Sequence, residues 1–152
     1  MKHTVIIGIG NILLRDDGVG VHTINYLRNE NISSTIELVD GGTSTLNILS
    51  YFLDYSRVIV IDCLRAGYEP GTIYKINPDE IINYKSENLS LHDVQILDVI
   101  KMANMIGKFP KVTIIGIEPE EISLNTELTE TIKNKVHEII KHIKYEIEKN
   151  LF

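Results

Sequence analysis

Short runs of apolar and β-branched residues alternate along the chain with segments in which apolar residues recur every three or four positions. The runs predict strands that are buried on both faces, and the recurring positions predict amphipathic helices between them. The predicted strands are 4–9, 35–39, 57–61, 72–76 and 111–117. Strands that alternate with helices predict a mostly parallel sheet covered by helices on both sides.

Four segments have the helical pattern. The first spans about 11 residues, and the second begins at Thr43 or Ser44. The third begins at Ser90-Leu91-His92-Asp93, which has capping-box spacing. The fourth begins near Thr129. The third is predicted to continue to Gly107, and the lysines and glutamates of the fourth are expected to face solvent. Their predicted buried faces are Gly20, Ile24 and Leu27; Leu46, Leu49 and Leu53; Val94, Leu97, Ile100 and Ile106; and Ile132, Val136, Ile139, Ile140, Ile143 and Ile147.

The segment 72–76 differs from the other strands because its apolar and polar residues alternate. This alternation is typical of an edge strand, and we expect this one to be antiparallel. We find no internal repeat, low-complexity tract or linker. The sequence therefore predicts a single domain over residues 1–152, built as a three-layer α/β/α sandwich with a mostly parallel twisted sheet of about five strands.

The composition of the 152 residues narrows the classes of function. With 15 basic and 21 acidic residues the net charge is −6, so we expect neither a nucleic-acid partner nor an anionic membrane surface. The single Cys63 can form neither an internal disulfide nor a cysteine zinc site, which favours a reducing compartment. No apolar run is long enough for a membrane span, and residues 1–4 lead directly into a short apolar stretch without a signal-peptide pattern. We therefore expect a cytoplasmic location.

Polar residues gather at the predicted carboxyl ends of the strands, where ligands bind in sheets of this kind. Asp16-Asp17 follow the first strand, Asp40-Gly41-Gly42-Thr43 the second, Asp62 the third and Glu118-Pro119-Glu120 the last. His92 falls in the first turn of the third helix. Four such coincidences on one edge of the sheet predict a functional site there.

Two of these residues have environments that favour metal binding. Asp62 ends a buried apolar strand, where an unpaired charge is costly, so it needs a metal ion or a cation such as Arg65. The positive end of a helix lowers the pKa of an imidazole, which would keep His92 neutral and able to coordinate. Together with Asp17 they supply two oxygens and one nitrogen, a set that suits nickel or zinc.

Other patterns have simpler explanations. Gly8-x-Gly10 resembles a dinucleotide fingerprint, but Leu13 stands where the third glycine belongs, so a tight turn is the favoured interpretation. Asp16-Asp17 can also act only as the cap of the first helix. His137 and His142 are five residues apart and point in different directions around a helix, so they cannot hold one ion. Strand alternation directs Cys63 away from Asp62, which favours a buried residue over a nucleophile.

Taken together, the motifs resemble the hydrogenase maturation proteases, the endopeptidases that trim the large subunits of nickel-iron hydrogenases. In chain order they are Gly8-Ile9-Gly10-Asn11-Ile12-Leu13, Asp16-Asp17-Gly18-Val19-Gly20, Asp40-Gly41-Gly42-Thr43, the strand ending at Asp62, Ser90-Leu91-His92, Gly116-Ile117-Glu118-Pro119 and Leu128-Thr129. The resemblance runs over nearly the whole chain. The order and spacing of these motifs make it more specific than any one of them.

This resemblance implies a single cut near the C-terminus of a hydrogenase large-subunit precursor after nickel insertion. The side chains that contact the metal in the family match Asp17, Asp62 and His92, and the first position is glutamate in some members and aspartate in others. The resemblance also implies that nickel arrives with the substrate, so we expect no permanently bound cofactor. The matching loop Asp40-Gly41-Gly42-Thr43 is implicated in substrate recognition. The oligomeric state stays open.

The chemistry of these residues is compatible with direct attack by water on a carbonyl that the metal polarises. A free carboxylate would take the proton, and Asp16 is one candidate for this base. No Gly-x-Ser-x-Gly motif indicates a serine nucleophile. Two alternatives remain at this point: a receiver-like signalling domain, which also has paired acids after its first strand, and a nucleotide-binding regulatory module. A receiver is disfavoured because the last strand ends in Ile117-Glu118-Pro119 without a lysine.

Overall fold

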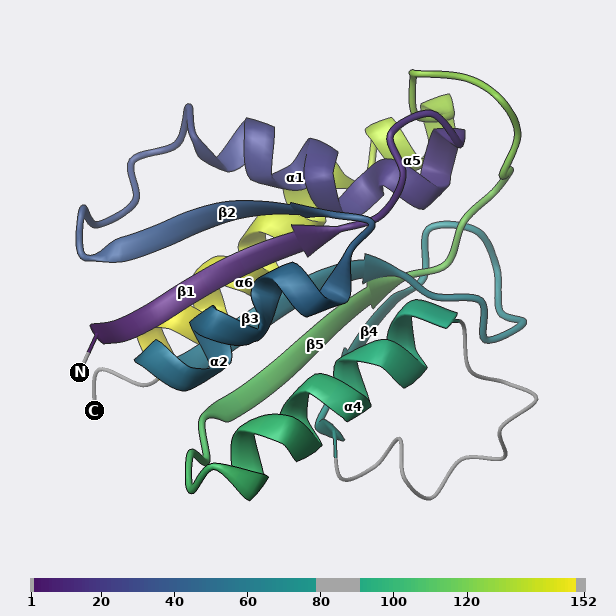
Figure 1. Ribbon diagram of the computed structural model, residues 1–152. Coiled ribbons are helices and arrows are strands. Elements are labelled where there is room, and N and C mark those ends of the chain that lie inside the picture. The colour runs from purple at the N-terminus through teal and green to yellow at the C-terminus, as the bar shows by residue number, and fades with distance from the viewer. Residues whose placement is uncertain (1, 79–90, 150–152) are drawn as a thin grey trace.

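The computed structural model describes residues 2–78 and 91–149 (Figure 1). Within these residues a five-stranded sheet has the order β2-β1-β3-β5-β4. Its strands are β1 (Lys2–Ile9), β2 (Ile36–Gly42), β3 (Tyr55–Cys63), β4 (Ile73–Ile76) and β5 (Lys111–Ile117). The pairs β1–β2, β1–β3 and β3–β5 are parallel, whereas β4 pairs antiparallel with β5 at the edge. The expected fold class and the antiparallel edge strand are both confirmed.

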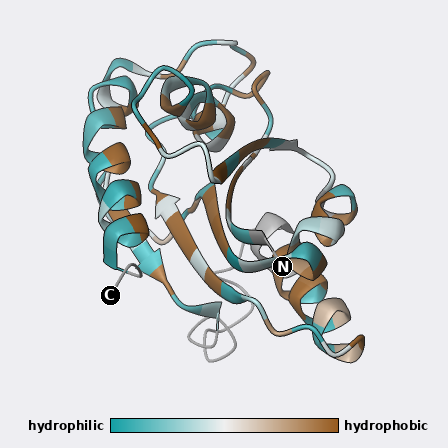
Figure 2. Ribbon diagram, turned by 90° about the vertical axis from the view of Figure 1, so that its left-hand side faces the viewer, coloured by the Kyte–Doolittle hydropathy of each residue, from teal (hydrophilic) through white to brown (hydrophobic). Residues whose placement is uncertain are grey.

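Helices cover both faces of the sheet, as Figure 1 shows. Short 3₁₀ helices, η1 (Arg15–Gly18) and η2 (Thr45–Ile48), directly precede α1 (Val19–Leu27) and α2 (Leu49–Asp54). The later helices are α4 (Leu91–Met105), α5 (Glu130–Lys133) and α6 (Val136–Lys149). α2 and α4 pack on one face, and α1, α5 and α6 pack on the other. In Figure 2 the strands are coloured largely as hydrophobic, whereas the helices alternate between hydrophobic and hydrophilic residues.

Alternation along each strand divides the core into two clusters. Val58 and Val60 of β3 pack under α2 and α4, whereas Ile59, Ile61 and Cys63 pack under α1 and α6. Cys63 is 5% exposed and faces the same side as Ile59 and Ile61, as its position in the strand predicts. The central strands are buried on both faces because helices cover both, and this explains their nearly continuous apolar sequence.

The second helical segment differs from its prediction. Leu46 is 65% exposed, whereas Leu49 and Leu53 are partly buried against the core as predicted, and the fully buried residues are Ile48 and Phe52. The segment begins as the 3₁₀ helix η2, which has three residues per turn, so the phase of the buried face shifts from that of an uninterrupted α-helix. Ser44 precedes η2 without a side-chain capping hydrogen bond, and the predicted cap is wrong.

The last helical segment begins after Thr129, as predicted, but Asn134 and Lys135 separate it into α5 and α6. Its expected buried residues are confirmed, with Ile147 only partly buried. The expectation that all its charged residues face solvent is wrong for Glu146, which is 2% exposed and pairs with Arg57 at 3.0 Å. In the third segment Ile106 lies beyond the end of α4 and is 63% exposed, so it is not part of the buried face.

No helix among the described residues combines the length and the apolar character that crossing a membrane requires.

Candidate functional site

The order of the strands places a topological switch point between β1 and β3. The chain leaves β1 toward β2 on one side and later returns to β3 on the other side. α1, which follows β1, and α2, which leads into β3, lie on opposite faces of the sheet, and in sheets of this kind ligands bind at the carboxyl ends of the strands at such a point. Asp17 lies in η1, which follows β1, and Asp62 is the penultimate residue of β3. Both predicted site residues therefore stand at this switch point.

Glycines allow the η1 turn to pack against the sheet. A Cβ atom at Gly10 would lie 2.0 Å from the carbonyl oxygen of Asp17, and one at Gly8 would lie 2.2 Å from that of Gly20. Gly10 also has φ +137°, a conformation that L residues rarely adopt. Backbone of this chain fills the space beside both glycines. They serve close packing, and the nucleotide-binding alternative is not favoured.

The turn after β1 holds Asp17 in place and connects it with the loop after β2. The half-buried carboxylate of Asp17 accepts a hydrogen bond from the Asn11 N–H at 2.9 Å. The adjacent Gly10 N–H donates to the carbonyl oxygen of Gly42 at 2.9 Å. The loop predicted to recognise substrate, Asp40-Gly41-Gly42-Thr43, is thus joined to the turn that contains Asp17.

Within that loop, Asp40 and Thr43 are exposed and the two glycines are half-buried. The Asp40 carboxylate accepts a hydrogen bond from the Gly42 N–H at 2.9 Å, which closes a short Asx turn. Gly42 has φ +56°, so glycine at this position lets the chain turn without strain. The loop presents exposed polar side chains at the carboxyl edge of the sheet.

Asp62 is fully buried, and its Oδ1 accepts a hydrogen bond from the Cys63 N–H at 2.8 Å. Burial raises the pKa of the Cys63 thiol, and the negative charges of Asp62 and Asp17 raise it further. The η1 turn that contains Asp17 also contacts β3, although 45 residues separate Asp17 from Asp62 in the chain. The protonated thiol is a poor nucleophile, in agreement with the structural role predicted for Cys63.

His92 lies in the first turn of α4, but its side chain lies outside the described residues, as does Ser90 of the predicted capping box. The helix packs through Ile96, Val99 and Ala103 on the face toward which alternation directs Asp62. Because α4 ends shortly before β5 begins, the helix runs back along the sheet, and its first turn lies toward the carboxyl edge (Figure 1). The imidazole position and its pKa stay predictions.

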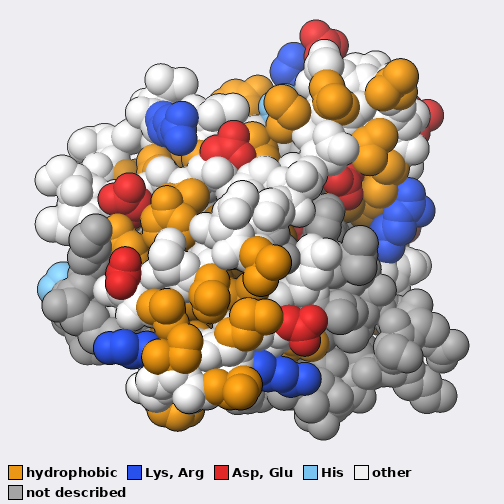
Figure 3. Space-filling model, in the orientation of Figure 1, with side chains coloured by type: hydrophobic (Ala, Val, Ile, Leu, Met, Phe, Trp, Pro, Cys, Tyr) orange, Lys and Arg blue, Asp and Glu red, His pale blue; other side chains and the backbone are white. Residues whose placement is uncertain are grey.

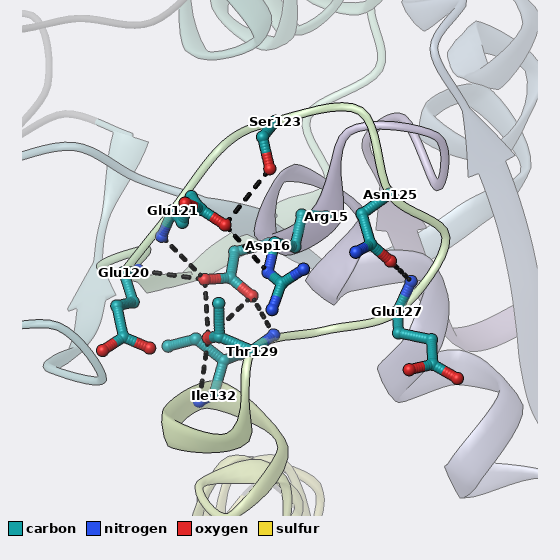
Figure 4. Close-up of polar contacts among 9 residues, drawn as sticks. All are labelled: Arg15, Asp16, Glu120, Glu121, Ser123, Asn125, Glu127, Thr129 and Ile132. Atoms are coloured by element: carbon teal, nitrogen blue, oxygen red, sulfur yellow. Dashed lines mark hydrogen bonds and ion pairs between the residues drawn. The ribbon is translucent and has the colours of Figure 1, made fainter.

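Asp16 does not fit the role of a general base. It is fully buried, and its two carboxylate oxygens accept hydrogen bonds from four donor groups, of which the Thr129 hydroxyl lies within reach of both oxygens (Figure 4). Because donors of this chain occupy both oxygens and the side chain is inaccessible to solvent, neither oxygen can contact a water molecule that attacks a substrate. Asp16 also does not cap α1, because its partners belong to the segment that precedes and caps α5. The predicted base is therefore wrong.

Glu118, at the end of β5, orders a second loop at this edge. It is 5% exposed, and its Oε1 accepts hydrogen bonds from the Ala66 N–H at 2.9 Å, the Tyr68 N–H at 3.1 Å and the Tyr74 hydroxyl at 2.8 Å. Burial and this hydrogen bond raise the pKa of Tyr74. Glu118 thus holds the loop that leaves Asp62, while Glu120 is exposed to solvent.

His22 in α1 was not marked by any motif, yet it lies beneath the loop before α5. Burial lowers the pKa of its imidazole, while a hydrogen bond with the Thr126 backbone and the charge of Asp16 act in the opposite direction. His137 and His142 are exposed on α6, in agreement with their prediction as surface residues. Among the side chains that the structure describes, no group of three His, Cys, Asp or Glu residues is arranged to hold a metal ion. The predicted set stays untested because it includes His92.

The turn 10–18 and the loop 118–129 expose large apolar side chains beside the candidate site. Ile12 is 45% exposed, Leu13 52% and Leu124 85%. In Figure 3 hydrophobic side chains gather at the upper right, where Figure 1 places these two segments. Backbone hydrogen bonds between Leu13 and Asn125, at 3.0 Å, and between Arg15 and Asn125, at 2.9 Å, hold the two segments together.

Comparison with known proteins connects this geometry with a family. A putative hydrogenase maturation protease of Methanocaldococcus jannaschii is 31% identical, with 97% of this chain and 98% of that protein covered. The hydrogenase expression/formation protein HupD of Rhizobium leguminosarum is 31% identical over 78% of this chain. The chain spans only 60% of that HupD protein and 63% of the one from Bradyrhizobium diazoefficiens.

Solved structures agree with the sequence matches. The hydrogenase maturating endopeptidase HybD from Escherichia coli superimposes with a TM-score of 0.86 at 25% identity, with 97% of this chain and 93% of that one covered. The family model for hydrogenase maturation proteases matches residues 21–146, which include Asp62 and His92 but not Asp17. The chain therefore belongs to the hydrogenase maturation protease family.

Proposed function

We propose that this protein is an endopeptidase that removes the C-terminal peptide of a nickel-iron hydrogenase large-subunit precursor after nickel has been inserted. The family and its named relatives support peptidase activity and a hydrogenase client. In this proposal nickel is part of the substrate, the protease needs no permanently bound cofactor, and the reaction takes place in the cytoplasm. Asp17, Asp62 and His92 contact the nickel that the precursor brings.

The observation that supports this site best is the convergence of Asp17 and Asp62 at the β1/β3 switch point. Asp17 lies in η1 and Asp62 in β3, and these two elements contact each other although they are far apart in the sequence. A half-buried and a fully buried carboxylate at one edge of the sheet would attract a divalent cation, and an imidazole from the first turn of α4 would complete a set suited to nickel. A client without nickel would leave these negative charges uncompensated, so the metallated precursor should bind more tightly.

The substrate nickel supplies Lewis acidity to the scissile carbonyl, and water attacks the carbonyl carbon directly. A carboxylate oxygen of Asp17 or Asp62 that does not contact nickel would accept the proton of this water and return it to the amide nitrogen as the C–N bond breaks. Asp16 is excluded from this step by its buried and occupied oxygens. The buried Cys63, whose thiol pKa is raised, does not fit the role of a nucleophile, so the proposal uses direct attack by water.

The loop Asp40-Gly41-Gly42-Thr43 would contact the precursor next to the metal. Its exposed Asp40 and Thr43 supply polar groups, and the Gly10–Gly42 hydrogen bond connects the loop with the Asp17 turn. Client binding at the loop and nickel contact at Asp17 would thus involve one connected segment of backbone. One precursor molecule would contact the loop with its polypeptide and Asp17 with its nickel.

Incubation with nickel-loaded and nickel-free large-subunit precursors, followed by mass measurement of the products, tests the proposal. We expect one C-terminal fragment from the nickel-loaded precursor and an intact chain from the nickel-free one. Equal cleavage of the two precursors would contradict the role of nickel. No cleavage of any nickel-loaded candidate, by a protein that contains intact Asp17, Asp62 and His92, would contradict the proposed activity.

A further inference from the structure

Asp16 is buried beside the candidate metal contact and joins two segments that are far apart in the sequence. Its Oδ2 accepts hydrogen bonds from the N–H groups of Glu120 and Glu121, both at 3.0 Å. Thr129 donates to Oδ1 through its N–H at 2.9 Å and to Oδ2 through its hydroxyl at 2.8 Å. Figure 4 shows these donors surrounding the carboxylate from one side of the loop 118–129 to the other.

A fully buried charge is unfavourable unless nearly every lone pair has a donor, and here the donors are mostly backbone amides. Backbone donors cannot rotate away as side chains can, so they fix the carboxylate relative to the main chain of the loop. An ion pair between Arg15 and Glu121 at 3.2 Å and the bridge between Leu14 and Asn125 add contacts on either side. The turn 10–18 is therefore held rigidly against the loop 118–129.

The position of Asp17 follows from that of Asp16. The two residues are consecutive in η1, and the carbonyl of Asp17 lies directly against Gly10. The Asp17 carboxylate in turn accepts its hydrogen bond from the Asn11 N–H. A shift of η1 away from the loop 118–129 would move the Asp17 carboxylate and break that hydrogen bond.

We propose that Asp16 is a positioning residue: its buried carboxylate fixes η1 against the loop 118–129 and so sets where the Asp17 carboxylate stands at the carboxyl edge of the sheet. This inference rests on the proposed function, in which Asp17 contacts the substrate nickel. It assigns to Asp16 a role in geometry and none in proton transfer. Metal-dependent chemistry is sensitive to such placement, since a displacement of about 1 Å can reduce a rate about a hundredfold.

Two substitutions test the inference from opposite ends of the chain. Asp16→Asn keeps the size of the side chain but replaces one accepting oxygen with an NH2 group. That group would face the backbone N–H groups that now donate to Asp16. Thr129→Val leaves Asp16 unchanged but removes both the hydroxyl donor to Asp16 and the α5 cap that accepts from the Ile132 N–H, and Thr129→Ser keeps both. Glu146→Gln is the matched control, because it alters another fully buried carboxylate that contacts Arg57, five residues before Asp62 in β3. Each variant is measured for stability in urea, for exchange of the Asn11 amide by NMR, and for kcat and KM on nickel-loaded precursor.

We expect Asp16→Asn to lower the protection of the Asn11 amide from hydrogen exchange by at least about tenfold relative to amides of β3. The reason is that the turn 10–18, once released from the loop 118–129, opens locally more often. Thr129→Val should do so to a smaller extent, and Thr129→Ser should restore protection. The two impaired variants should lose kcat, whereas Glu146→Gln should lose stability with no selective change at Asn11. Wild-type Asn11 protection and kcat in both Asp16→Asn and Thr129→Val would overturn the inference.

Failure of the proposed function has a different signature. If Asp17→Ala processes precursor normally, the proposed metal contact is wrong whatever Asp16 does. If Asp17→Ala abolishes processing while Asp16→Asn and Thr129→Val leave it unchanged, only the positioning role of Asp16 is overturned.

Discussion

At the carboxyl edge of the sheet, Asp16 and Glu118 accept hydrogen bonds largely from backbone N–H groups of neighbouring loops. At the amino edge, Glu146 pairs with the side-chain cations of Arg57 and Lys75, which connect α6 with the sheet. All three carboxylates are nearly inaccessible to water. Asp16 and Glu118 hold loops in place, whereas Glu146 holds α6 against the sheet.

Backbone donors fix the path of a loop, so the carboxyl-edge carboxylates determine where neighbouring side chains stand. A side-chain ion pair fixes one element against another and leaves the loops unaffected. We therefore expect changes at the carboxyl edge to affect processing more than stability, and changes at the amino edge to affect stability alone. The following predictions test this distinction, from the largest expected effect to the smallest.

Removal of a proposed metal contact should have the largest effect. Asp17→Ala, Asp62→Ala and His92→Ala should each abolish processing, a loss of at least about a hundredfold, because each removes an interaction with the reacting centre. Asp62→Asn is a useful companion, since it can still accept from the Cys63 N–H while losing the charge. The measurement is the rate of precursor cleavage together with circular dichroism. Wild-type processing by folded His92→Ala would remove it from the site.

Glu146→Ala should reduce the free energy of unfolding by about 3 kcal/mol without slowing cleavage, because it leaves the buried Arg57 guanidinium without its principal anion. Urea denaturation measures the loss. The double variant Arg57→Met/Glu146→Leu replaces the pair with apolar groups and should recover most of the stability. Slower processing by the stably folded double variant would contradict the separation of the two edges.

Cys63→Ala should leave processing unchanged and cost on the order of 1 kcal/mol of stability, the loss expected for a small buried group. The reason is that burial and the nearby carboxylates raise the pKa of its thiol and keep it protonated. Cleavage kinetics and urea denaturation together check this prediction. Loss of activity in a protein of normal stability would support a thiol mechanism.

The smallest expected effect concerns pH. Burial lowers the pKa of His22 below 6.5 in the folded protein, so the unfolded chain binds a proton more readily. The free energy of unfolding should therefore be unaffected by His22 above pH 6.5, where the imidazole is neutral in both states. It should decrease as the pH falls below that value. Unfolding free energies measured across this range should depend less on pH in His22→Gln. The exposed His137→Gln serves as control, and an equal flattening in both variants would exclude His22 as the cause.

Several features were predictable because they depend on short-range patterns. Alternation in 72–76 correctly indicated an antiparallel edge strand, and alternation at the end of β3 correctly directed Cys63 to the side of Ile59 and Ile61. In the second helix Leu49 and Leu53 face the core as predicted but Leu46 does not, since the 3₁₀ start that shifts the phase has no clear signal in the sequence. Local periodicity indicates an element and its general face, but not small changes in helical geometry.

The sequence by itself determined the α/β architecture and the placement of Asp17 and Asp62 at strand ends, because both follow from local hydrophobic patterns and from the rule that parallel strands end at one edge. Only the tertiary structure showed that Asp16 is fully buried and surrounded by donors, whereas its neighbour Asp17 is half-buried. The partners of Asp16 lie 104 to 113 residues away, and the Glu146–Arg57 pair spans 89 residues. Whether a carboxylate is buried and satisfied or free to meet a substrate depends on such distant donors, which only the folded chain brings into contact with it.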